Sequence, residues 1–206
     1  QALLQTAQPL LAWYPLHARD LPWRHTQEPY RIWLSEIMLQ QTRVEAVKNY
    51  YARFLETFPD IAALAAAEQD QVNKCWEGLG YYSRAANLRK AAQTIQEQYG
   101  GVFPRTWEEV RGLAGVGDYT AGAVCSICYG LPTPAVDGNV LRVAARVMNH
   151  FCEIDRPEQK AAVTALLRQV YLDNPEHCGT LTQAFMEIGA TVCVPNGQPH
   201  CEACPL

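Results

Sequence analysis

One glycine turn and one aspartate have the types and spacing for chemistry on a charged ligand. The turn reads Leu-Ala-Gly-Val-Gly at residues 113–117, and Asp137 follows Gly117 by twenty positions. Glycine permits positive φ and close backbone approach, and the N–H groups of a following helix are natural ligands for a phosphate. The glycine spacing alone is equally compatible with an ordinary corner between two helices. Asp137 alone is compatible with a helix N-cap, a role that leaves its carboxylate available for chemistry.

A second carboxyl group, Glu36, lies in the string WLSEIMLQQT at residues 33–42. Its neighbours are apolar at helical spacing, and burial of this kind would raise the carboxyl pKa and keep a proton available for donation. An isolated glutamate on an amphipathic helix is more often exposed. The wider string therefore has to decide between these two interpretations.

The elements that must position these residues are helices. Periodicity of 3.6 residues dominates and no segment alternates like a strand, so we expect an all-α protein. Pro29 should open a helix over residues 30–41, and Gly100 and Gly101 should end a long helix over residues 84–99. We expect two helical lobes, one of residues 24–137 and a second of residues 1–23 plus 138–206.

Composition limits the class of protein. Hydrophobic residues make up 49% and charged residues 18% of the chain, and no apolar run is long enough to cross a bilayer. The N-terminus does not resemble a signal peptide, so we expect a cytoplasmic monomer of the bacterial cytosol or nucleoid, away from membranes. The net charge of −4 requires any nucleic-acid surface to be local. Candidates for such a basic face are Arg19, Arg24, Arg31, Arg43, Arg84, Arg89 and Lys90.

The eight cysteines fall into two groups. We expect those in apolar helical patterns to be reduced core residues, namely Cys75, Cys125, Cys128, Cys152 and Cys178. The others, Cys193, Cys201 and Cys204, crowd near the last residue, Leu206. Such clustering indicates a metal site in a reducing compartment.

The WLSEIMLQQT string resembles the signature of the MutY family of adenine DNA glycosylases, which remove adenine mispaired with 8-oxoguanine. The glycine turn resembles the helix-hairpin-helix element of DNA glycosylases, with Ala114 where proline is commonest. LPWR at 21–24, GLGYYSR at 78–84 and the stretch 183–189 also match this family. The resemblance covers nearly the whole chain in the family's order. It covers the catalytic core and not the C-terminal domain with which the family reads 8-oxoguanine.

The resemblance implies roles for four residues at the catalytic centre. Glu36 would protonate the departing adenine at N7, and Asp137 would stabilise the positive sugar centre. Tyr119 and Asn139 would support these carboxyl groups. Tyr119 also occupies the position at which lyase relatives such as endonuclease III carry a nucleophilic lysine. Hydrolysis without efficient strand cleavage is therefore expected.

The resemblance also implies a partner, double-stranded DNA with a mispaired adenine. A target base must leave the stack before the chemistry, so other groups must hold the duplex open. By the family pattern Gln41 and Tyr81 wedge into the helix. The remaining candidates for binding the DNA or the adenine are Trp23, Arg24, Leu39, Gly115, Gly117, Thr120 and Glu187.

The family ends its core with four cysteines that bind a 4Fe-4S cluster. Cys193, Cys201 and Cys204 stand in that order here, with one additional residue between the first two. The fourth cysteine is expected just beyond Leu206, because Cys178 precedes a helix rather than the loop.

Two other functions remain open at this point. Thymine or uracil mismatch glycosylases of the same superfamily can also carry tyrosine after the hairpin, although the Leu-Gln-Gln-Thr string favours adenine. A DNA-binding module without catalysis is the other alternative, and the presence of both Glu36 and Asp137 disfavours it.

Overall fold

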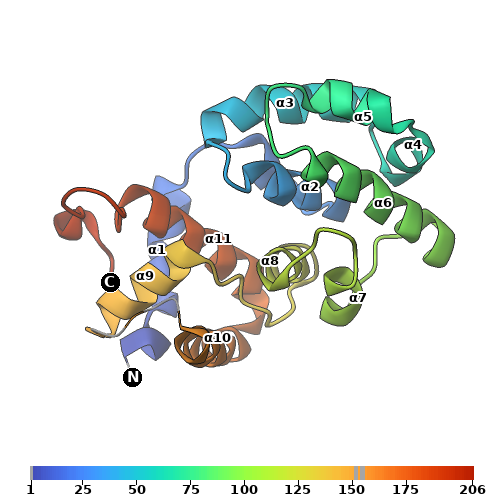
Figure 1. Ribbon diagram of the computed structural model, residues 1–206. Helices are drawn as coiled ribbons and strands as arrows, with labels where there is room; N and C mark the ends of the chain where they lie inside the picture. Colours follow the sequence, from blue (N-terminus) through green and yellow to red (C-terminus); the bar gives the residue numbers. More distant parts are fainter. Residues whose placement is uncertain (1, 151–152, 154–155) are drawn as a thin grey trace. The chain divides into compact units, whose positions relative to one another are not determined.

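The computed structural model of the chain describes residues 2–150, 153 and 156–206 (Figure 1). No strand occurs within these ranges, which confirms the expected all-α class. The helices are α1 (Ala7–His17), α2 (Pro29–Leu39), α3 (Val44–Thr57), α4 (Ile61–Ala66), α5 (Gln69–Trp76), α6 (Ser83–Gln98), α7 (Trp107–Arg111), α8 (Asp118–Tyr129), α9 (Gly138–Val147), α10 (Pro157–Leu172) and α11 (Cys178–Thr191). No helix of the described residues is both long enough and apolar enough to span a membrane.

The chain divides into two compact units. Unit 2 is Leu21–Thr120, and unit 1 combines Gln1–Asp20 with Ala121–Leu206. From the sequence we expected the boundaries between the two lobes after residues 23 and 137, and the two units have theirs after residues 20 and 120. The second boundary differs because α8 from Ala121 onward, and the segment that leads to Asp137, pack within unit 1.

Unit 2 is built from α2 to α7. Helix α6 contacts α2, α4 and α5, while α3 contacts α2 and α5. Trp33, Phe54 and Trp76 are fully buried among these helices, and the rings of Phe54 and Trp76 meet edge to face. Helix α2 begins where the sequence predicts, at Pro29, because the preceding Glu28 carboxylate accepts hydrogen bonds from the first helical N–H groups.

Unit 1 is centred on α11, which contacts both α1 and α9 (Figure 1). Its apolar core includes Leu10, Val140 and Phe185, each at most 1% exposed. At Gly189 a side chain would bring its Cβ within 3.1 Å of Asn139 Cβ, so this glycine lets α9 and α11 approach closely.

Of the cysteines expected in the core, two of the four that the structure describes are buried. Cys125 and Cys178 are buried, whereas Cys75 and Cys128 are half-buried. None of these four forms a disulfide with another described cysteine. Cys152 lies outside the described residues.

Candidate active site

Glu36 lies in the middle of α2, where residues 32–38 are all buried. Its side chain is 6% exposed, which confirms the burial predicted from the spacing of its apolar neighbours. Carboxyl groups are rarely buried in this way, because burial of the charged form is costly unless it is partnered. Glu36 belongs to unit 2.

Asp137 is the N-cap of α9 in unit 1, as the sequence suggested. Its Oδ1 accepts a hydrogen bond of 2.9 Å from the N–H of Val140, and its Oδ2 accepts one of 3.0 Å from the side-chain amide of Asn139. Asn139 Oδ1 in turn accepts a bond of 2.9 Å from Arg142 Nη2, and Arg142 Nε donates to the Cys193 carbonyl at 2.9 Å. Both carboxylate oxygens are thus oriented by donors, at a helix end that favours negative charge.

The two glycines of the turn in unit 2 differ in what they require. Gly115 has φ +74, and a Cβ there would lie 2.7 Å from Asn87 Cβ, so both backbone and packing demand glycine. Gly117 has no positive φ, and a Cβ there would meet nothing within 4 Å. Gly117 is exposed directly before the N-terminus of α8. No described neighbour accounts for glycine at 117, and close approach by a ligand would account for it.

The residues that follow the turn are less accessible. Thr120 is 1% exposed, and its hydroxyl lies 3.5 Å from Gln40 Nε2. Its predicted contact with DNA would therefore have to involve backbone rather than an exposed hydroxyl. Tyr119 is half-buried in the first turn of α8.

Gln41 and Tyr81, the predicted wedges, share an unusual backbone conformation in unit 2. Both are exposed, with φ of +56 at Gln41 and +48 at Tyr81. The Tyr81 side chain is 63% exposed. The sequence predicted that α2 continues to Gln41, but the helix ends at Leu39 because Gln41 turns into the left-handed region.

The predicted contacts to the adenine lie at different depths. Trp23 is 5% exposed and packs edge to face on Tyr51, with ring centroids 5.4 Å apart. Arg24 and Leu39 are half-buried. Arg84, counted above among candidate exposed cations, is only 7% exposed and therefore does not belong to a basic surface.

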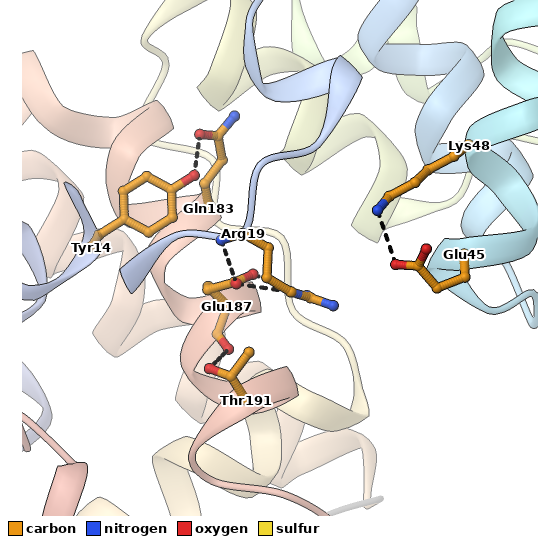
Figure 2. Close-up of polar contacts among 7 residues, drawn as sticks. All are labelled: Tyr14, Arg19, Glu45, Lys48, Gln183, Glu187 and Thr191. Atoms are coloured by element: carbon orange, nitrogen blue, oxygen red, sulfur yellow. Dashed lines mark hydrogen bonds and ion pairs between the residues drawn. The ribbon is translucent and has the colours of Figure 1, made fainter. Parts of the chain in front are cut away.

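Glu187 of α11 is fully buried in unit 1 and is held by Arg19 (Figure 2). Its Oε1 accepts bonds from the Arg19 N–H and Nε at 2.9 and 2.8 Å, and its Oε2 accepts one from Nη2 at 3.0 Å. Figure 2 also shows Tyr14 donating to Gln183 Oε1 at 2.9 Å, one turn before Glu187. No sequence pattern indicates the Arg19–Glu187 pair, because 168 positions separate its members.

The terminal cysteines line one cavity of about 200 Å³ in unit 1. Cys193 is buried, Cys204 is half-buried and Cys201 is exposed. Arg146, on the cavity wall, places Nη1 3.3 Å from Cys193 Sγ. Among the described residues no three histidine, cysteine or acidic side chains are grouped closely enough to hold a metal ion.

Cys178 does not belong to this group. It is 1% exposed, and its Sγ lies 3.5 Å from the Pro175 carbonyl. Burial raises the pKa of the Cys178 thiol, which keeps it protonated and unsuited to bind metal.

Residues 34–169 match the model of the HhH-GPD superfamily of base excision DNA repair proteins. The chain is 43% identical to human adenine DNA glycosylase over 96% of its length and 37% of that protein. It is 36% identical to adenine DNA glycosylase of Buchnera aphidicola subsp. Baizongia pistaciae, covering 97% of the chain and 56% of that relative. The chain thus spans only part of these relatives. A solved structure of a thermostable thymine-DNA glycosylase superposes with a TM-score of 0.85 at 26% identity, covering 98% of this chain and 91% of the other.

Proposed function

The chain belongs to the HhH-GPD superfamily of base excision DNA repair proteins, and from that premise we propose that it removes adenine mispaired with 8-oxoguanine or guanine by hydrolysis. The observation that carries this proposal is the pair of carboxyl groups held in two different environments. Glu36 is buried in the middle of helix α2, and the Asp137 carboxylate accepts hydrogen bonds at the N-terminus of helix α9. Identity of 43% with human adenine DNA glycosylase supports adenine as the base.

The two groups divide the chemistry of glycosidic cleavage. Glu36 transfers its proton to N7 of adenine, so the base leaves as a neutral molecule with the electrons of the C1′–N9 bond. The sugar is left with positive charge, which the Asp137 carboxylate stabilises until water adds at C1′ and loses a proton. Asn139 orients Asp137 through its amide hydrogen bond. Tyr119 offers no amine, so no Schiff base forms and the strand stays intact.

Double-stranded DNA is the proposed partner. The open space at Gly117 and the N–H groups at the start of α8 support a phosphate contact at the hairpin. The exposed side chains of Gln41 and Tyr81 are proposed to fill the gap left by the extruded adenine.

We assign the cysteine cavity to a 4Fe-4S cluster. Cys193, Cys201 and Cys204 would supply three thiolates, and Arg146 supplies positive charge beside them. These three cysteines stand in the order in which the family places its cluster ligands, and a fourth thiolate would come from outside these 206 residues. The cluster itself would supply local structure to the loop, because thiolate ligation couples to folding.

The function is tested with three duplexes that carry adenine opposite 8-oxoguanine, adenine opposite guanine, or thymine opposite guanine. Abasic sites are revealed by alkaline cleavage, and an Asp137→Asn preparation controls for contaminating glycosylases. We expect alkali-dependent breaks at adenine in the first two duplexes only. Release of thymine, or breaks at adenine without alkali, would contradict the proposal.

Thymine is the second candidate base, because the thymine-DNA glycosylase structure shares the fold at 26% identity. The higher identity to adenine DNA glycosylases, over nearly the whole chain, favours adenine. The thymine-guanine duplex in the same assay separates the two.

A further inference from the structure

Arg84 is a buried cation attached to the end of α2. Its Nη1 donates to the carbonyls of Ile37 and Met38 at 3.0 Å each and to that of Gln40 at 2.6 Å. In a continuing helix these carbonyls would accept N–H groups four residues later. The guanidinium takes the place of those donors, so the chain can leave the helix before Gln41 without losing hydrogen bonds.

The same guanidinium also holds a second turn. Its Nη2 donates to the carbonyls of Leu79 and Gly80 at 3.2 and 3.1 Å, directly before Tyr81. The Arg84 guanidinium carbon lies 5.2 Å from the Trp76 ring centroid and 5.7 Å from that of Tyr81. One buried side chain thus joins two segments that lie more than thirty positions apart, at 37–42 and 79–81.

Each joined segment contains an exposed residue with positive φ, Gln41 at +56 and Tyr81 at +48. This conformation is strained for a non-glycine residue and persists only where the surroundings enforce it. We infer that Arg84 is the positioning residue that presents Gln41 and Tyr81 as one rigid pair to the DNA stack. The inference rests on the proposed function of these two residues as wedges.

Arginine is specific for this task. Its planar fork donates in several fixed directions at once, whereas a lysine ammonium is a compact charge that cannot reach both turns in the same geometry. Arg84→Lys should therefore keep the buried charge and lose the link between the turns. Arg156→Lys is the control for the exchange itself, because the exposed Arg156 guanidinium pairs with Glu153 in unit 1 and belongs to none of the proposed DNA contacts.

The first measurement is single-turnover adenine release from two duplexes, with adenine opposite either 8-oxoguanine or an abasic site whose stack is already open. A misplaced wedge should slow Arg84→Lys by about 100-fold on the intact duplex. On the open duplex the rate of Arg84→Lys should be close to that of wild type, and Arg156→Lys should match wild type on both duplexes. Thr42→Val removes the hydroxyl 3.2 Å from Arg84 Nη2 and should show the same pattern more weakly. This variant tests the inference if Arg84→Lys does not fold.

The second measurement is amide hydrogen exchange of the protein without DNA. This measurement does not require enzymatic activity. Exchange should accelerate in segments 40–43 and 79–82 of Arg84→Lys and stay unchanged in α4. Unchanged exchange in both segments, or equal slowing on the two duplexes, would overturn the role of Arg84. Wild-type protein that releases no adenine at all would refute the proposed function instead, and hydrogen exchange would still decide whether Arg84 holds the two turns.

Discussion

Glu36 and Asp137, the two candidate catalytic carboxyl groups, are held by opposite kinds of local structure. Glu36 lies inside a helix among apolar neighbours and is 6% exposed. Asp137 lies at the first position before a helix, half-buried, with a donor on each oxygen. A site that excludes water suits a proton donor, and a site rich in donors suits a carboxylate that must stay charged. The contrast between the two sites therefore indicates two roles, and each role can be removed separately.

The largest expected effect comes from the charge of Asp137. Asparagine caps helices as well as aspartate does, so Asp137→Asn should leave the unfolding midpoint unchanged. Without the negative charge beside the sugar, the rate of adenine release should fall by about a thousandfold. Thermal unfolding and single-turnover release measure the two effects.

Asp60→Asn is the matched control, because Asp60 caps α4 through the same type of bond, 2.8 Å to Ala63 N. It should change neither quantity. The opposite result would be a lower unfolding temperature with a normal rate of adenine release by the folded protein. It would show that Asp137 serves only as a helix cap.

A smaller effect is expected from the donor that orients Asp137. Asn139→Ala removes the bond to Oδ2 and should slow release by about tenfold, the rate equivalent of one charge-assisted hydrogen bond. Asn174→Ala, which removes a bond of 2.8 Å to the Val170 carbonyl elsewhere in unit 1, should leave the rate unchanged. Single-turnover rates at saturating enzyme compare the two variants. Equal rates for the two variants would show that Asn139 does not assist Asp137 in the reaction.

Local patterns predicted the immediate surroundings of both carboxyl groups. The apolar spacing around Glu36 predicted its burial, and the position of Asp137 before a helix predicted the cap, because both depend on residues within one helical turn. The start of α2 at Pro29 followed for the same reason. Periodicity and capping rules act over these short distances.

Long-range partners could not be predicted. Arg84 belonged to a predicted basic face, yet it is buried because carbonyls from two distant turns compensate its desolvation. The same contacts end α2 earlier than its periodicity suggests. Arg19 and Glu187 pair across most of the chain. No spacing rule connects such residues, since the tertiary fold alone brings them together.

In the proposed reaction adenine leaves because Glu36 gives a proton to N7 while Asp137 stabilises the sugar. The most direct test is Glu36→Gln on two duplexes, one with ordinary adenine and one with N7-methyladenine, whose fixed positive charge makes the proton unnecessary. We predict that Glu36→Gln loses release of adenine and still releases N7-methyladenine above its spontaneous loss, in a manner that depends on Asp137. Equal loss of both bases in folded Glu36→Gln protein, or normal release of adenine, would contradict the claim.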